Sequence, residues 1–170
     1  MRAWWPVPVL SIAFAYVCSQ AASHEYTSKG VTVAHPWARA TPGGARVGSV
    51  YLEVRAQRGR GDKLIAARSP VAGNAEIHSH VMEQGIAKMR RVDAVAVPGG
   101  QSIVLQPSGY HIMLMDLKQP LNEGDLTKVT LVFEMAGEIE VDATVEPIGA
   151  TGPHGFSEQP GTGGGHRHKH

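Results

Sequence analysis

Short runs rich in β-branched residues, separated by turn-forming clusters, recur along the sequence from Val31 to about Pro147. Gly, Pro, Asn and Asp interrupt these runs at regular intervals, and no segment carries a helical period long enough to compete. This pattern predicts an all-β domain, either a two-sheet sandwich or a barrel, in preference to alternating strands and helices. The expected strands are Val31–Ala34, Val47–Val54, Lys63–Ala67, Glu76–Val81, Ala87–Val92, Ser102–Leu105, Tyr110–Leu117, Lys128–Phe133 and Glu138–Val145.

The N-terminal segment has the features of an export signal. Arg2 is followed by an apolar stretch, Val7–Val17, and then by the small residues of Ser19–Ala22. We therefore expect residues 1–22 to be cleaved and the mature protein to reside in the periplasm. The apolar stretch is too short to span a bilayer comfortably, so no membrane-spanning segment is expected after cleavage.

The only cysteine, Cys18, falls inside this signal. A lipoprotein, which would retain that cysteine, needs a small residue before it, and the bulky Val17 stands there instead. The expected mature chain therefore has no thiol, and neither a disulfide nor a thiolate ligand is available to it.

The remainder of the chain divides into one domain, residues 30–147, and a tail, residues 148–170. The tail is rich in Gly, Pro and His and has almost no large apolar residue, so we expect it to be flexible. The 16 basic and 15 acidic residues nearly balance and form no basic patch interleaved with aromatics. Nucleic acid is therefore an unexpected partner, and so is an anionic membrane surface.

Soft and borderline metal ligands concentrate in the segment from Glu76 to Met89. Side chains alternate faces along a strand, so His78, His80 and Met82 share one face. A two-residue turn at Gln84–Gly85 would place His80 directly opposite Met89, with His78 on the diagonal. This hairpin would gather imidazole and thioether groups on one face.

A second group of such ligands lies in Tyr110–Met115, where His111, Met113 and Met115 share a face. Thioether sulfur is neutral and soft, so it suits Cu(I) and contributes little to the binding of Zn(II) or of hard cations. Without a thiolate, a His/Met set is expected to prefer Cu(I) to Cu(II). Residue types and faces predict a copper site but leave His80, Met82 and Met115 open as ligands or as core filler.

The spacing of four of these residues resembles the motif of the PCu(A)C family of periplasmic copper chaperones. That motif is His, ten residues, Met, twenty-one residues, then His-x-Met, and it fits His78, Met89, His111 and Met113 without a gap. Pro36–Thr41, Gly48–Leu52 and Pro107–His111 are also similar to the family, and the resemblance covers Val31 to Val145.

The resemblance implies a cupredoxin-like Greek-key β-sandwich that binds Cu(I) through these two histidines and two methionines. It implies delivery of copper to the CuA centre of cytochrome c oxidase subunit II, with a Sco-type protein as a further partner. Trp37 and Arg39 are expected to support the fold rather than to touch the metal. We expect a monomer.

The tail contains His154, His166, His168 and His170. The last three alternate with Arg and Lys and could bind Cu(II) weakly through imidazoles on a flexible chain. His35 has no expected role, whereas His24 could form an amino-terminal copper site if cleavage occurs after Ala21.

Other functions fit these residues less well. A blue-copper electron carrier needs a Cys thiolate, which the expected mature chain lacks. No nucleophile–base arrangement is visible, so we do not expect an enzyme. A periplasmic protein that buffers copper without delivering it remains the alternative to a chaperone, because both functions need a reachable and exchangeable site.

Overall fold

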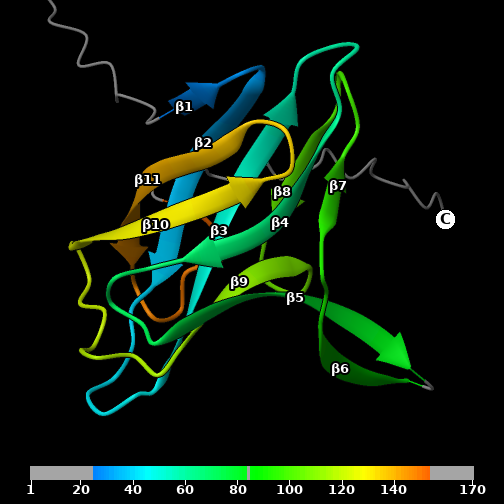
Figure 1. The fold of residues 1–170 in the computed structure, drawn as a ribbon. Helices are drawn as coiled ribbons and strands as arrows, with labels where there is room; N and C mark the ends of the chain where they lie inside the picture. The colour runs from blue at the N-terminus through cyan, green and yellow to red at the C-terminus, as the bar shows by residue number, and fades with distance from the viewer. Residues whose placement is uncertain (1–24, 84, 154–170) are drawn as a thin grey trace, which may run out of the picture.

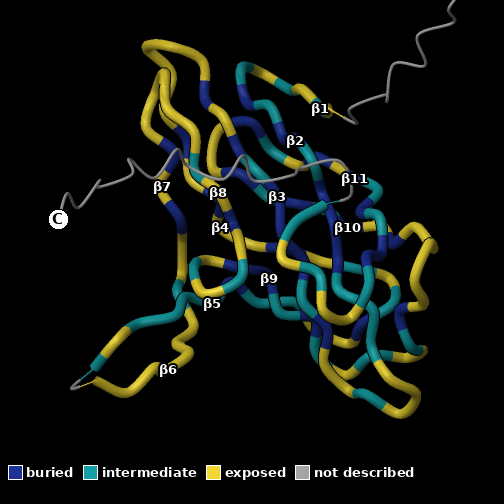
Figure 2. Tube along the Cα trace, turned by 180° about the vertical axis from the view of Figure 1, so that it is seen from behind, coloured by how far each residue is buried: buried dark blue, intermediate teal, exposed yellow. Residues whose placement is uncertain are grey.

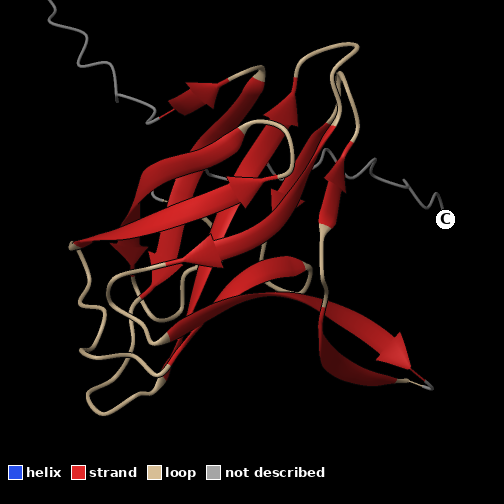
Figure 3. Ribbon diagram, in the orientation of Figure 1, coloured by secondary structure: helices blue, strands red, loops and turns tan. Residues whose placement is uncertain are grey.

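The computed structural model describes residues 25–83 and 85–153, which form eleven strands and no helix (Figure 1; Figure 3). None of the described segments is a helix long and apolar enough to cross a membrane. The strands are β1 (Glu25–Ser28), β2 (Val31–Arg39), β3 (Val47–Ala56), β4 (Asp62–Arg68), β5 (Asn74–Glu83), β6 (Ile86–Arg91), β7 (Val95–Val97), β8 (Ser102–Leu105), β9 (Tyr110–Met115), β10 (Leu126–Phe133) and β11 (Gly137–Glu146). The all-β prediction is confirmed, and all nine expected strands are present.

The strands form one continuous path of hydrogen-bonded neighbours, in the order β6-β5-β9-β3-β2-β11-β10-β4-β7. The short strands β1 and β8 pair with β2 and β3, respectively. Apolar side chains from every strand of this path except β6 pack into a single core. The largest fully buried side chains are Phe133, Leu52, Leu64, Leu105, Ile112, Leu114 and Leu131. The sheet thus folds over on itself, as a sandwich does, and leaves an outer face on β5, β9 and β3.

A β-bulge in β2 decides which side chains reach that outer face. Before the bulge Val33 pairs with Val54 of β3, and after the bulge Ala38 pairs with Val50; all four residues belong to the core. Val33 and Ala38 are separated by an odd number of positions, so in a regular strand their side chains would lie on opposite faces. The extra residue lies between Ala34 and Trp37, where His35 has a φ of 50° and Pro36 has no N–H to leave unpaired. As a result Trp37 is directed away from the core. No sequence pattern predicted this bulge.

Strand β1 lies before residue 30, the expected start of the domain, and was missed because it is short and polar. It pairs with β2 through a two-residue turn at Lys29–Gly30, with φ values of 45° and 88°. Two positive φ values suit a hairpin turn that matches the twist of its strands. Strand β7, only three residues long, was also not predicted.

The β5–β6 hairpin projects from the body of the domain (Figure 1; Figure 2). The pairing of β5 with β9 runs only from Asn74 to Ser79, whereas its pairing with β6 continues to Glu83. Every residue of β6 is exposed, which Figure 2 shows as a continuous exposed arm. The hairpin therefore has one end in the sheet and the other in solvent.

The first residues after β11 contact β2. The guanidinium of Arg39 donates two hydrogen bonds, of 3.0 and 2.6 Å, to the carbonyl oxygen of Ala150. The amide of Ala150 also donates to the carbonyl of Pro147 at 2.9 Å. The export signal, His24 and the four tail histidines lie outside the described residues.

Candidate metal centre

The pairing of β5 with β9 brings two of the four predicted ligands together. His78 is directly opposite His111 in the register, and their ring centroids are 6.0 Å apart. The neighbouring pair, Ile77 and Ile112, points into the core from the other face of the sheet. The same alternation that buries the isoleucines therefore places both imidazoles on the outer face.

The two predicted methionines lie on the same face as the histidines. Met113 follows His111 by two residues, and its partner in β5 is Glu76. Met89 is directly opposite His80, so it lies diagonal to His78, as the predicted two-residue turn required. Met89 is 47% exposed, whereas His111 is only 2% exposed. The site thus has a buried imidazole at its inner end and an accessible thioether at its outer end.

A backbone carbonyl determines which nitrogen of His111 can bind a metal. Nδ1 of His111 lies 3.2 Å from the carbonyl oxygen of Gly109, so Nδ1 carries the proton and donates it. The lone pair is then on Nε2. Burial lowers the pKa of His111, and the neighbouring His80 and His78 lower it further, although the bond to Gly109 opposes them. These effects favour the neutral imidazole, which is the form that binds metals.

For His78, the carboxylate of Glu76 determines which ring nitrogen can bind a metal. Nε2 of His78 lies 2.9 Å from Oε2 of Glu76, and Arg91 and Asn74 contact the other oxygen at 3.4 and 3.1 Å. Hydrogen bonding from His78 and the charge of Arg91 lower the pKa of Glu76, so this carboxylate is ionised and can only accept. Nε2 of His78 therefore carries the proton, which leaves the lone pair on Nδ1. That nitrogen is buried and has no hydrogen-bond partner.

Sequence reasoning did not assign Glu76 a role, although one signal was visible. Glu76 precedes His78 by two residues, so a strand places the two side chains on one face. A metal-binding histidine commonly donates its other N–H to a carboxylate or a carbonyl. Glu76 and the Gly109 carbonyl occupy those two positions here.

An aromatic layer supports the inner end of the site. The rings of Trp37 and Tyr51 have centroids 4.4 Å apart, and the ring of Tyr51 is 6.3 Å from that of His111. The guanidinium of Arg39 lies over Tyr51, 5.8 Å from its centroid. Trp37 and Arg39 thus both contact Tyr51.

The three residues left open by the sequence lie in different environments. The ring centroid of His80 is 5.2 Å from that of His111, so His80 belongs to the same cluster. Met82 is 71% exposed on the projecting hairpin, and Met115 lies further along β9, opposite Val47. Counting only His, Cys, Asp and Glu, no group of three or more in the described part of the chain is arranged to hold a metal ion.

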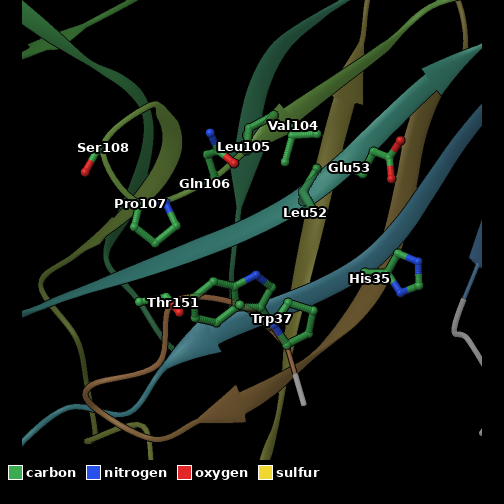
Figure 4. A pocket seen from close by; sticks show the side chains of 12 residues that line it. His35, Trp37, Leu52, Glu53, Val104, Leu105, Gln106, Pro107, Ser108 and Thr151 are labelled. Carbon is green, nitrogen blue, oxygen red and sulfur yellow. The ribbon is translucent and has the colours of Figure 1, made fainter. Parts of the chain in front are cut away.

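An open cleft of about 600 Å³ lies over β2, β3 and β8 (Figure 4). Trp37, Glu53, Val104, Pro107 and Thr151 are among the residues that line it. Neither the predicted ligands nor His80 contribute to its walls. The cleft is therefore a feature separate from the candidate metal centre.

The fold and the arrangement of the site define a PCuAC-type β-sandwich domain. The apo PCuAC domain from PmoF1 is 34% identical, with a TM-score of 0.63, and the match covers 73% of this chain and 99% of that one. The copper-bound PCuAC domain from PmoF2 is 31% identical, with the same TM-score and coverages of 73% and 98%. CuI-DR1885 from Deinococcus radiodurans is 26% identical, with a TM-score of 0.56 and coverages of 75% and 83%.

The family profile described as "Putative lipoprotein LpqE-like" matches residues 31–145, and the chain belongs to this LpqE-like family. An uncharacterised protein, RP573 of Rickettsia prowazekii, is 33% identical over 103 residues, which are 58% of this chain and 57% of that protein. The putative lipoprotein Lxx21020 of Leifsonia xyli subsp. xyli is 33% identical over 106 residues, with coverages of 61% and 62%. The chain thus spans about three fifths of the length of these curated relatives.

Proposed function

We propose that this protein is a copper carrier that binds Cu(I) through His78, Met89, His111 and Met113. The observation that carries the proposal is the pair of facing imidazoles, in which a carboxylate and a carbonyl leave one lone pair on each ring. Copper-bound relatives support the choice of metal, since the PmoF2 domain and CuI-DR1885 are both described with copper.

The donor set favours Cu(I) on chemical grounds. Two neutral imidazoles and two neutral thioethers supply no anionic ligand to offset the charge of Cu(II), and thioether sulfur prefers the softer ion. The site needs no thiol deprotonation, so copper can enter and leave without a large change in protons. Such a centre suits transport rather than catalysis, and we propose that the protein is not an enzyme.

The ligand assignment is tested by exchanging both thioethers for isosteric hydrocarbons, Met89→Leu with Met113→Leu. Leucine keeps the volume of methionine, so the fold is expected to survive while Cu(I) affinity falls about 100-fold or more. Competition with a Cu(I) chelator measures the affinity, and circular dichroism checks the fold. The exposed Met135→Leu, on the β10–β11 turn, is the matched control. An unchanged affinity in the double variant would show that the ligands are elsewhere.

The recipient we propose is the CuA centre of cytochrome c oxidase subunit II, reached directly or through a Sco-type protein. Cu(I)-loaded protein would be mixed with the apo soluble domain of subunit II, and the absorption of the CuA centre would be followed. If no copper moves, and oxidase activity is normal in a deletion strain, the alternative of copper buffering is the better description.

The remaining parts of the proposal concern location and state. A periplasmic location after cleavage of residues 1–22 fits the export signal, and the lipoprotein in the name of the Leifsonia relative is consistent with an envelope protein. We propose that the mature chain is monomeric. We also propose that His166, His168 and His170 bind Cu(II) weakly, separately from the main site.

A further inference from the structure

One imidazole in the cluster is absent from the proposed ligand set. His80 is directly opposite Met89 in the hairpin, and its ring centroid is 5.2 Å from that of His111. The corresponding distance from His78 to His111 is 6.0 Å. A metal bound to two imidazole nitrogens at about 2 Å holds the ring centroids roughly 5 to 6 Å apart. His111 is therefore placed to share one metal ion with either His78 or His80.

His78 and His80 each have a buried Nδ1 without a partner, but only the ring of His78 is held by a carboxylate. Nδ1 of His80 and Nδ1 of His78 are both buried without a hydrogen-bond partner. A buried polar atom left in this way is unfavourable, and a ligand bound to it would remove that cost. The ring of His78 is held by Glu76, whereas the contact that fixes His80 is made by its backbone, whose amide donates to the Gly109 carbonyl at 3.3 Å.

The side chains on this face become more exposed from β9 towards the tip of the β5–β6 hairpin. His111 is buried, His80 is half-buried, Met89 is 47% exposed and Met82 is 71% exposed. Met82 shares the face of His80, because the two are separated by two residues in β5. The donors thus form a row that leads from the sheet to the solvent-exposed part of the projecting hairpin.

We propose that His80 is the release ligand of the site. His80 replaces His78 on Cu(I) while His111, Met89 and Met113 stay bound, and Met82 is the next donor towards solvent. One Cu–N bond to His80 forms and one to His78 breaks; copper remains Cu(I), and the exchange transfers no proton. Glu76 keeps its hydrogen bond to Nε2 of His78 throughout. This inference rests on the proposed Cu(I) site and deepens it.

The test separates the rate of copper release from the affinity. Cu(I)-loaded protein is mixed with the chelator bathocuproine disulfonate in a stopped-flow instrument, and the equilibrium affinity is measured by competition with the same chelator. For His80→Asn we expect release to slow about tenfold or more while the affinity changes by less than about threefold. His35→Asn removes an imidazole outside the cluster and is the matched control, since Asn tolerates the positive φ at that position.

A second pair of variants tests whether copper leaves by way of Met82, and both substituted residues are exposed, so the fold does not depend on them. Met82→Leu is expected to slow release severalfold, whereas Met135→Leu, 67% exposed on another turn, should not. The inference is overturned if His80→Asn and His35→Asn release copper at the same rate. It is also overturned if His80→Asn weakens affinity as strongly as His78→Asn, because His80 would then be a permanent ligand. If the wild-type protein itself fails to hold Cu(I), the proposed function fails instead.

Discussion

The hydrogen bond between Glu76 and His78 makes a quantitative prediction about copper affinity. Glu76→Gln removes the charge that orients His78 and that pairs with Arg91. Loss of such a supporting partner costs 10- to 100-fold in metal affinity in comparable sites. The carboxylate here is 17% exposed, so water can partly replace it, and we expect the lower end, about tenfold or ~1.4 kcal/mol.

The measurement is a competitive Cu(I) titration of Glu76→Gln, with thermal unfolding of the apo protein alongside it. Because ion pairs at partly exposed positions contribute little, the apo protein should lose less than about 1 kcal/mol of stability. Glu53→Gln is the matched control: its side chain is 19% exposed, it pairs with Arg55, and it lies on β3. Equal losses of affinity in the two variants, or none in Glu76→Gln, would refute the role assigned to this carboxylate.

Three further predictions concern the fold and the tail. Asp62→Ala should destabilise the protein by about 3 kcal/mol in chemical denaturation, because this buried carboxylate accepts three backbone N–H groups, two of them from the β10–β11 turn. Gly99→Ala should cost about 1–3 kcal/mol, because its Cβ would lie 2.8 Å from the backbone nitrogen of Arg60, whereas Gly43→Ala, which meets nothing within 4 Å, should be neutral. Removal of residues 154–170 should abolish weak Cu(II) binding in equilibrium dialysis and leave Cu(I) affinity unchanged.

Local pattern was enough to predict the strands and the hairpin. Alternation and turn residues located nine strands, and the two-residue turn correctly set His80 opposite Met89. Both features depend on residues within a few positions of each other, so they can be read without tertiary information. The same reasoning missed β1, which is short and polar, and β7, which is only three residues long.

The sequence by itself determined the chemistry available to this protein: imidazole and thioether donors on three strands, with no thiol in the described domain. Tertiary structure decided how those donors meet. The pairing of His78 with His111 joins residues 33 positions apart, and the bulge in β2 turns Trp37 towards the aromatic layer beside them. Tertiary structure also placed the ring of His80 closer to the ring of His111, at 5.2 Å, than the ring of His78, at 6.0 Å. No local pattern encodes these distances, because they depend on which strands become neighbours when the whole core is buried.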